Sequence, residues 1–297
     1  MSETFDFPDE SVPPALEDKT IIVAGGGRGI GKATAVYLAD AGANVVVNRV
    51  SENPEVAEII RDRGGTAMAH FGDVSSLSYT EELIADTAAE YGSVDGVINF
   101  AGILRDTYLL EMSEEQWDQV IDVHLKGHFS LLRNAARHWH DQADGDALDT
   151  ERSFVTVTSR QALGSVGQLN YASAKAGLLG MTWTAASELS RFNVRVNSLM
   201  PLAFTEMIAQ IPEEHRPAGW TRERMPPGKV APVAAYLLSE EAADVNGCIV
   251  RSHADMVGLI SEPEINPVAY REDGWTFDTL AERFEDTLGD DGSLDRA

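Results

Sequence analysis

Short apolar runs alternate with stretches of helical spacing throughout the first half of the chain. The runs lie at residues 20–24, 45–47, 67–71 and 94–99, and the stretches between them carry apolar positions three or four residues apart. Short apolar strands that alternate with helices are typical of βαβ units, whose right-handed crossovers make neighbouring strands parallel. The pattern therefore predicts a mostly parallel sheet covered by helices.

The same alternation continues in the second half. Its first helix begins with a capping-box pattern, in which Gln116 follows Ser113 by three residues, and is predicted to run to about residue 140. Further helices are predicted over 168–190 and 230–238, and strands over 154–157, 194–199 and 248–250. We find no internal repeat and no sign of a second domain.

This order of elements predicts one α/β domain, with a doubly wound and Rossmann-like sheet, over residues 18–260. An acidic N-terminal extension is expected over 1–17, and a C-terminal extension over 261–297 with an amphipathic helix at 277–288. Residues 202–229 are rich in proline and charge, which predicts a mobile substrate segment within the domain.

Composition narrows the class of protein. With 297 residues, 43% of them hydrophobic, the chain can bury one large core. No apolar run approaches the roughly 18 residues that span a bilayer, and the N-terminus lacks the basic and apolar regions of a secretory signal. Cys248 is the single cysteine, so neither an internal disulfide nor a cysteine metal cluster is expected. We expect a cytoplasmic protein without a metal.

The charge balance excludes some partners. Lys and Arg number 23 against 48 Asp and Glu, for a net charge of −25, and five of the 23 are Lys. Nucleic acid and anionic membranes are poor partners for such a surface. The acidity favours adaptation to high salt, where a Debye length of about 3 Å at 1 M screens self-repulsion. An ordinary acidic protein is the alternative.

A glycine-rich loop joins the first strand to the first helix. Gly25, Gly29 and Gly31 are its spaced glycines, with Arg28 and Ile30 among them. Glycines let a backbone approach a pyrophosphate closely, and a helix N-terminus offers free N–H groups with a favourable dipole. The loop is therefore a candidate dinucleotide site, although a tight structural turn would also explain it.

Polar and small residues follow two further strands. Asp73 and Val74 come after the third strand, where a carboxylate could meet an adenine amino group. Asn99, Ala101 and Gly102 come after the fourth, where small residues would let a ribose come close. Ordinary turn chemistry explains each of them singly, but together they favour a dinucleotide across the strand ends.

The end of the second strand bears on the choice of nicotinamide. An acid there binds the ribose hydroxyls, whereas a base accommodates the additional phosphate. The chain has Asn48 and Arg49 at this place, with no acid before Glu52, and Arg28 lies in the glycine loop. NADP(H) is favoured and NAD(H) is possible, the alternative being that Arg49 is a solvated loop charge.

Tyr171 and Lys175 are four residues apart near the start of a predicted helix, and so share one face. Reduction of a carbonyl needs a proton for the developing alkoxide, and a tyrosine, with an ordinary pKa near 10, can donate it. A neighbouring ammonium is expected to lower that pKa. The pair, which follows the fifth strand, is therefore the predicted catalytic centre.

In this order the glycine loop, Asn99–Gly102 and the Tyr171 and Lys175 pair resemble the short-chain dehydrogenase/reductase family over nearly all of residues 18–260. The resemblance implies a homo-oligomer, a tetramer or a dimer. It also implies that Tyr171 is the acid/base and that Lys175 binds the nicotinamide ribose.

The resemblance leaves other roles less settled. In the family a serine hydroxyl polarises the substrate carbonyl. The family's usual spacing from the tyrosine would place this hydroxyl at Thr158, whereas alignment of the fifth strand places it at Ser159. We favour Ser159. His124 replaces the family's relay asparagine, and would either hold a relay water or merely pack. The usual Pro-Gly is Pro201-Leu202, and Thr205 stands where the family contacts the nicotinamide amide.

The substrate is an inference from the resemblance alone. Residues 99–106, 123–127 and 167–171 look most like those of (3R)-hydroxyacyl-CoA dehydrogenases and 3-oxoacyl thioester reductases. A 3-oxoacyl thioester is thus the expected substrate. Another ketone (a steroid, sugar or small carbonyl) and a catalytically silent nucleotide-binding scaffold are the alternatives. Four arginines could meet a CoA phosphate, although the sequence favours charges that offset local acidity: Arg105, Arg216, Arg222 and Arg224.

Overall fold

The computed structural model describes residues 5–8, 11–143, 147–209, 211, 213–263, 268–272 and 274–288. In this part of the chain eight strands form one sheet in the order β3-β2-β1-β4-β5-β6-β7-β8. All neighbours pair in parallel except β7 and β8. The strands are β1 (Thr20–Ala24), β2 (Asn44–Arg49), β3 (Thr66–Phe71), β4 (Gly96–Asn99), β5 (Arg152–Val157), β6 (Val194–Leu202), β7 (Ile249–His253) and β8 (Met256–Ile260).

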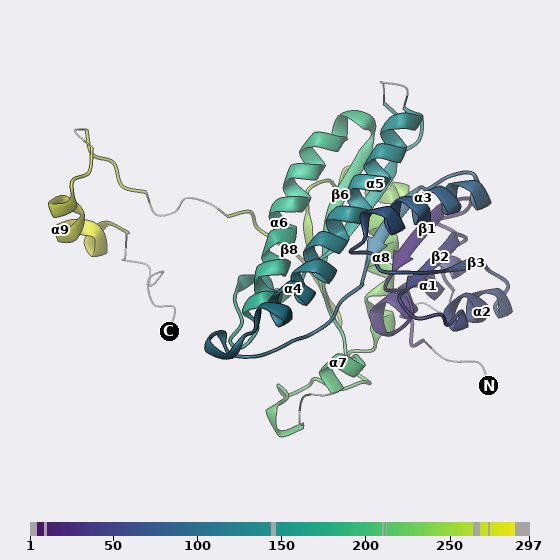
Figure 1. The fold of residues 1–297 in the computed structure, drawn as a ribbon, viewed down its shortest axis with the longest axis horizontal. Coiled ribbons are helices and arrows are strands. Elements are labelled where there is room, and N and C mark those ends of the chain that lie inside the picture. The colour runs from purple at the N-terminus through teal and green to yellow at the C-terminus, as the bar shows by residue number, and fades with distance from the viewer. Residues whose placement is uncertain are drawn as a thin grey trace. The chain divides into compact units, whose positions relative to one another are not determined.

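Helices cover both faces of this sheet (Figure 1). Helices α1, α2 and α8 pack over one face, and α3, α5 and α6 over the other, each with its own buried hydrophobic cluster. The helices are α1 (Gly29–Asp40), α2 (Glu55–Asp62), α3 (Leu77–Tyr91), α4 (Glu114–Ile121), α5 (Gly127–Gln142), α6 (Leu169–Leu189), α7 (Glu206–Ala209), α8 (Ala231–Leu238) and α9 (Phe277–Leu288). The prediction of a doubly wound, mostly parallel α/β fold is confirmed. Among the described residues no helix has the length and apolarity needed to cross a bilayer.

Strand order places the cofactor edge. β1 lies between β2 and β4, so the order of strands reverses beside it. In doubly wound sheets ligands bind beyond the carboxyl ends of the strands at such a reversal. The glycine loop, which follows β1, therefore lies at the expected place.

Two elements differ from the sequence expectation. The helix predicted from 113 to 140 is divided by a π-helical turn at Asp122–Lys126 between α4 and α5. The edge strand β8, which the sequence reading missed, pairs with β7 through a tight hairpin in which Ala254 has a φ of +49°. No glycine or Asn-Gly pair marks that hairpin, which is why the pattern did not reveal it.

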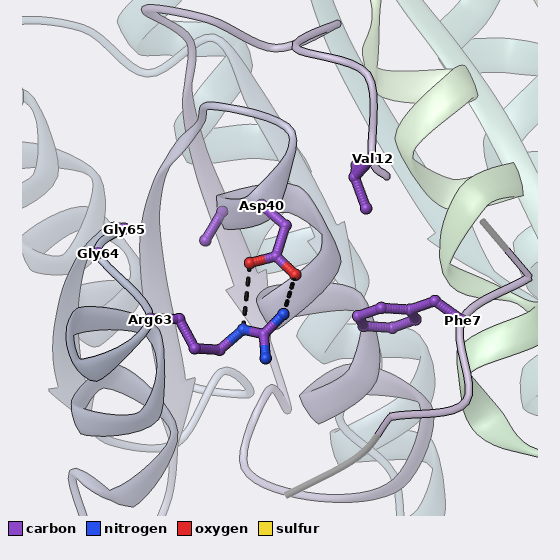
Figure 2. Close-up of a pocket in the computed structure, with 7 residues that line it drawn as sticks. Phe7, Val12, Asp40, Arg63, Gly64 and Gly65 are labelled. Atoms are coloured by element: carbon purple, nitrogen blue, oxygen red, sulfur yellow. Dashed lines mark hydrogen bonds and ion pairs between the residues drawn. The ribbon is translucent and has the colours of Figure 1, made fainter. Parts of the chain in front are cut away.

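The stretch expected as an N-terminal extension packs on the domain. Leu16 is fully buried, and Phe5, Phe7 and Val12 lie against the core. Figure 2 shows Phe7 and Val12 near the ion pair of Asp40 and Arg63, around a cavity of about 410 Å³. The segment thus continues the core beyond α1 and α2.

The chain divides into two units, residues 1–260 and residues 261–297. The first holds the sheet and all the residues discussed as site candidates. In the second, α9 has exposed apolar side chains at Phe277, Leu280 and Phe284, which recur at helical spacing.

Candidate active site

At Gly25 and Gly31 the glycine loop leaves no room for a side chain. A Cβ on Gly25, whose φ is +68°, would lie 2.3 Å from the backbone nitrogen of Ala101, and one on Gly31 would lie 2.4 Å from the carbonyl oxygen of Gly25. Such contacts bring the loop after β1 against the loop after β4. Gly29 has a φ of +55°, a conformation that favours glycine.

The first turn of α1 is open to an anion. Its N-cap residue, Arg28, makes no side-chain capping hydrogen bond, and within the described helix no acidic residue lies in the first turn. The free N–H groups of a helix N-terminus attract phosphate, and they are usually capped when no ligand uses them. Uncapped N–H groups beside a glycine-rich loop fit the pyrophosphate of a dinucleotide. Ile30 lies in this turn and is partly buried against the core.

Arg49 lies against the same loop. A Cβ on Gly27 would be 3.0 Å from its Nε, which also donates a hydrogen bond to Ser51 Oγ at 3.1 Å. Arg28 is exposed and lies 3.7 Å from Glu206 of α7. The two arginines expected at the ribose therefore both border the loop, Arg49 from the end of β2 and Arg28 from within.

The residues after β3 and β4 are placed along the same edge. Asp73 is exposed, and its Oδ1 accepts a hydrogen bond from the amide of Ser75 at 2.9 Å. Val74 is buried against Gly127. Asn99 is fully buried, and its Oδ1 accepts from the amide of Ala101 at 2.9 Å. Asp73 and Asn99 are thus both used in shaping turns.

Tyr171 and Lys175 project from the first turns of α6, where Lys175 is buried and Tyr171 is partly buried. Lys175 Nζ lies 5.6 Å from the centre of the Tyr171 ring and donates to the carbonyl of Val157, the last residue of β5, at 2.5 Å. Burial lowers the pKa of Lys175 to about 7. The ammonium is therefore held at the end of β5 beside the phenol.

The pKa of Tyr171 is raised in this structure, whereas the sequence led us to expect a net lowering by Lys175. Burial raises the pKa of Tyr171, against a hydrogen bond with Ser159 that acts to lower it, and the charge of Asp106 raises it further. Lys175 directs its Nζ to the Val157 carbonyl, so its charge does not outweigh burial. The phenol stays protonated, which suits a group that gives up a proton.

The geometry separates Ser159 from Thr158. The Thr158 hydroxyl is buried and donates to the backbone carbonyl of Lys175 at 2.8 Å. The Ser159 hydroxyl is partly exposed, donates to Gln161 Oε1 at 2.6 Å, and is hydrogen-bonded to Tyr171. Of the two hydroxyls, only that of Ser159 is hydrogen-bonded to Tyr171.

His124 stands in the π-turn with its ring edge-on to Tyr171, at 4.9 Å between ring centres and 88° between planes. Its Nε2 lies 2.8 Å from the carbonyl oxygen of Ile103, and a Cβ on Gly102 would be 2.5 Å from its Cε1. Its Nδ1 is buried and has no hydrogen-bond partner among the described residues. Burial, with the charge of Lys175, lowers the pKa of His124 to about 3, so the ring is neutral.

His128 is a member of this cluster that the sequence reading missed. The amide of Val157 donates to its Nε2 at 3.1 Å, and its Nδ1 donates to the carbonyl of His124 at 2.6 Å. Its ring is fully buried, and burial and the charge of Lys175 lower its pKa well below the ordinary value. His128 therefore joins the π-turn to the end of β5. Its spacing of four residues from His124 was the available signal.

The remaining expected residues lie where the substrate segment begins. Pro201 pairs with Ser252 of β7 near the carboxyl end of β6. The Thr205 Cγ2 would be 3.4 Å from a Cβ on Gly29. Thr205 thus lies over the glycine loop, so one continuous edge joins that loop, α6 and the start of residues 202–229.

Comparison with known proteins agrees with this arrangement. Residues 19–216 match the short chain dehydrogenase family. The chain is 38% identical over 276 residues to hydroxyacyl-CoA dehydrogenase ChsB1 of Mycobacterium tuberculosis, covering 89% of this chain and 86% of that protein. It is 34% identical over 243 residues to the 3-oxoacyl-[acyl-carrier-protein] reductase FabG of Thermotoga maritima, covering 79% and 96%.

A solved structure extends the likeness to the fold. A short chain dehydrogenase from Mycobacterium avium superposes with a TM-score of 0.83 at 32% identity, over 93% of this chain and 95% of that one. The family match over residues 19–216 includes the glycine loop and the helix that carries Tyr171 and Lys175. The chain therefore belongs to the short-chain dehydrogenase/reductase family of oxidoreductases and, as a member, uses a nicotinamide dinucleotide.

Proposed function

We propose that this oxidoreductase transfers hydride between NADP(H) and the 3-carbonyl of an acyl thioester, interconverting 3-oxoacyl and (3R)-hydroxyacyl forms. The observation that carries the proposal is the partly buried Tyr171, hydrogen-bonded to Ser159, with Lys175 Nζ 5.6 Å from its ring centre. The names of two relatives, a hydroxyacyl-CoA dehydrogenase and a 3-oxoacyl reductase, support the thioester.

The bound dinucleotide supplies the hydride, and the protein supplies the proton and its control. Ser159 donates a hydrogen bond to the substrate carbonyl oxygen, which polarises the carbonyl. Tyr171 gives its phenolic proton to the same oxygen as negative charge develops there. Lys175 Nζ has three N–H donors, which the Val157 carbonyl cannot all use. Its positive charge stabilises the phenolate that remains.

His124 is proposed to help reprotonate the centre. Its Nδ1 is buried and unpartnered among the described residues, and its ring meets Tyr171 edge-on. Buried polar atoms usually have a partner, and ordered water is the usual one when the protein offers none. A water on Nδ1 would stand beside Tyr171 and Lys175, as a proton relay requires.

NADP(H) is proposed in preference to NAD(H). Arg49 borders the glycine loop at the end of β2, where a base accommodates the 2′-phosphate of the ribose. We expect Arg49→Ala to raise the KM for NADPH by about tenfold, the equivalent of roughly 1.4 kcal/mol, and to leave the KM for NADH within about twofold. A wild-type preference for NADH would contradict this part of the proposal.

The function is tested with purified protein in molar KCl, following NADPH absorbance with acetoacetyl-CoA and longer 3-oxoacyl-CoAs. We expect thioesters to turn over with a higher kcat/KM than steroid, sugar or small ketones. Turnover of simple ketones alone would favour a reductase of another carbonyl. Cofactor binding without turnover of any carbonyl would favour a silent nucleotide-binding scaffold.

We also propose a preference for high salt and an oligomeric state. The net charge of −25 supports a medium of high salt, in which self-repulsion is screened. We therefore expect the melting temperature to rise between 0.1 and 2 M KCl, and a flat response would oppose it. A homotetramer or dimer is expected from family membership, and light scattering coupled to gel filtration would measure it.

A further inference from the structure

A cavity of about 320 Å³ lies between the β7–β8 hairpin and residues 218–224 of the substrate segment. Trp220 and Arg224 contribute one part of its lining, and His253 and Met256 of the hairpin contribute another. β7 is hydrogen-bonded to β6, and His253 pairs with Leu202. The cavity therefore lies at the carboxyl edge of the sheet, next to the strand that carries Pro201.

Positive charge gathers at this cavity in a strongly acidic protein. Neither Arg224 nor Arg251 forms a salt bridge with a carboxylate among the described residues. Asp255 is ion-paired with Lys229 at 2.5 Å. Burial, followed by the charges of Arg251 and Arg224, lowers the pKa of His253. Arg224 lines the cavity, and the charge of Arg251 also reaches His253 from nearby. Asp255 lines the cavity as well, but its carboxylate is ion-paired with Lys229, which leaves Arg224 to attract an anion there.

An aromatic ring accompanies these charges. The Trp220 indole is partly buried in the lining, and the Arg224 guanidinium packs on Gly219, where a Cβ would lie 2.9 Å from its Nη1. Arginine recognises phosphate by paired N–H donors, and an indole face stacks on a nucleobase. The combination fits a phosphorylated nucleoside better than an acyl chain, which would need apolar walls.

The distance to the catalytic centre suits a substrate with a long arm. Neighbouring strands lie about 4.8 Å apart, so the carboxyl ends of β5 and β7, separated by β6, are roughly 10 Å apart. Ser159 follows β5, and His253 ends β7. A ligand that reacts at Ser159 and Tyr171 and also reaches Trp220 must therefore have an arm that spans at least this distance.

We propose that this cavity binds the adenosine phosphate end of a CoA thioester, with the adenine ring stacked on Trp220 and a phosphate group paired with Arg224. The inference rests on the proposed function, because it assumes an acyl thioester at Tyr171. It assigns CoA as the carrier and gives a role to Arg224, which the sequence alone favoured as an incidental charge.

The experiment compares acetoacetyl-CoA with acetoacetyl-pantetheine, which has the same reacting group and arm but no nucleotide. For Arg224→Ala we expect the KM for the CoA thioester to rise about tenfold, with kcat retained and the pantetheine thioester unaffected. Arg224→Lys should recover part of the loss. Arg191→Ala, an arginine stacked on Phe192 at the opposite edge of the sheet, is the matched control and should change neither KM.

A second measurement needs no turnover. With the dinucleotide site filled by NADP⁺, free CoA should quench tryptophan fluorescence in the wild type, and Trp220→Phe should remove most of the quenching. Arg224→Ala should weaken CoA binding about tenfold, and circular dichroism would establish that both variants are folded.

The outcomes separate the two proposals. Equal effects of Arg224→Ala on both thioesters, or no effect on either, would overturn the CoA site while thioester reduction stood. Preference for an acyl-carrier-protein thioester over acetoacetyl-CoA would overturn CoA as the carrier. If no thioester turns over, the proposed function fails, and CoA binding at Trp220 still decides whether the cavity takes a phosphorylated nucleoside.

Discussion

The catalytic centre and the cavity at Trp220 lie on the same edge of the sheet but are built in opposite ways. In the centre the ionisable groups are buried and held by backbone atoms, as Lys175 is by the carbonyl of Val157 and His128 by the amide of the same residue. At the cavity Arg224 is exposed and has no carboxylate partner among the described residues. Burial therefore sets protonation in the centre, whereas at the cavity charge acts over distance and is screened by salt. Changes in the centre should alter kcat and pH dependence, and changes at the cavity should alter KM.

The largest effect expected from this comparison is the loss of the phenolic hydroxyl in Tyr171→Phe. General acid catalysis contributes about 100- to 10,000-fold, so kcat should fall by that factor. The dissociation constant for NADPH should stay within about twofold, because the ring and Lys175 remain. Stopped-flow turnover and NADPH fluorescence would measure the two quantities. Tyr236→Phe, on the exposed side of α8, is the control, and wild-type turnover in Tyr171→Phe would remove the proposed mechanism.

The second-largest effect is expected on NADPH affinity when Gly25 of the glycine loop is replaced by alanine, with Gly64 as the control position. Both have positive φ, at +68° and +90°, but a Cβ on Gly25 meets the backbone of Ala101 at 2.3 Å whereas one on Gly64 meets nothing within 4 Å. Strained backbone conformations cost about 1–3 kcal/mol. Gly25→Ala should therefore weaken NADPH binding by about 10- to 100-fold, and Gly64→Ala should lower stability slightly without changing affinity. Calorimetric titration with NADPH tests the pair, and equal affinities would refute the loop as the cofactor site.

The fold and the Tyr171 and Lys175 pair could be predicted because their signals are local. Apolar runs show strands directly, and a tyrosine and a lysine four residues apart share a helix face wherever that helix is placed. The strand order and β8 needed the structure. Strands β7 and β8 meet at a turn in which Ala254, not glycine, takes a positive φ.

The missed parts of the site depend on contacts between distant segments. His128 acts through Val157, 29 residues further along the chain, and its spacing alone does not reveal which strand it meets. The choice between Ser159 and Thr158 depends on which hydroxyl turns toward α6, where Thr158 bonds the Lys175 carbonyl. The direction of the Tyr171 pKa depends on burial, which no motif records.

The buried lysine predicts a pH dependence that the exposed cavity should not share. Because the pKa of Lys175 is lowered to about 7, its ammonium is lost as pH rises through that value. If the ammonium stabilises the phenolate, kcat/KM for reduction should fall about tenfold per pH unit above about 7. The ratio of wild-type to Arg224→Ala KM should stay constant over the same range. A profile that is level from pH 6 to 9 would show that Lys175 does not act as the charged form.

The smallest effect concerns stability and the two buried histidines. The pKa of His124 is lowered to about 3 from the ordinary 6.5, and that of His128 is also well below it. As pH falls from about 6.5 toward 3, the unfolded chain takes up protons that these rings refuse in the folded state, so the free energy of unfolding falls. Each ring should contribute up to about 1.4 kcal/mol per pH unit in that window.

His124→Asn should therefore reduce the slope of stability against pH by about that amount between pH 6 and 4. Urea unfolding at half-unit steps of pH would measure it, and carboxylates titrate equally in both proteins and cancel. His140→Asn, on an exposed side of α5, removes an imidazole without opening the cluster and serves as the control. An unchanged slope in His124→Asn would mean that the ring titrates with its ordinary pKa in the folded state, and hence that burial does not keep water from the catalytic centre. The contrast between a closed centre and an open cavity would then be lost.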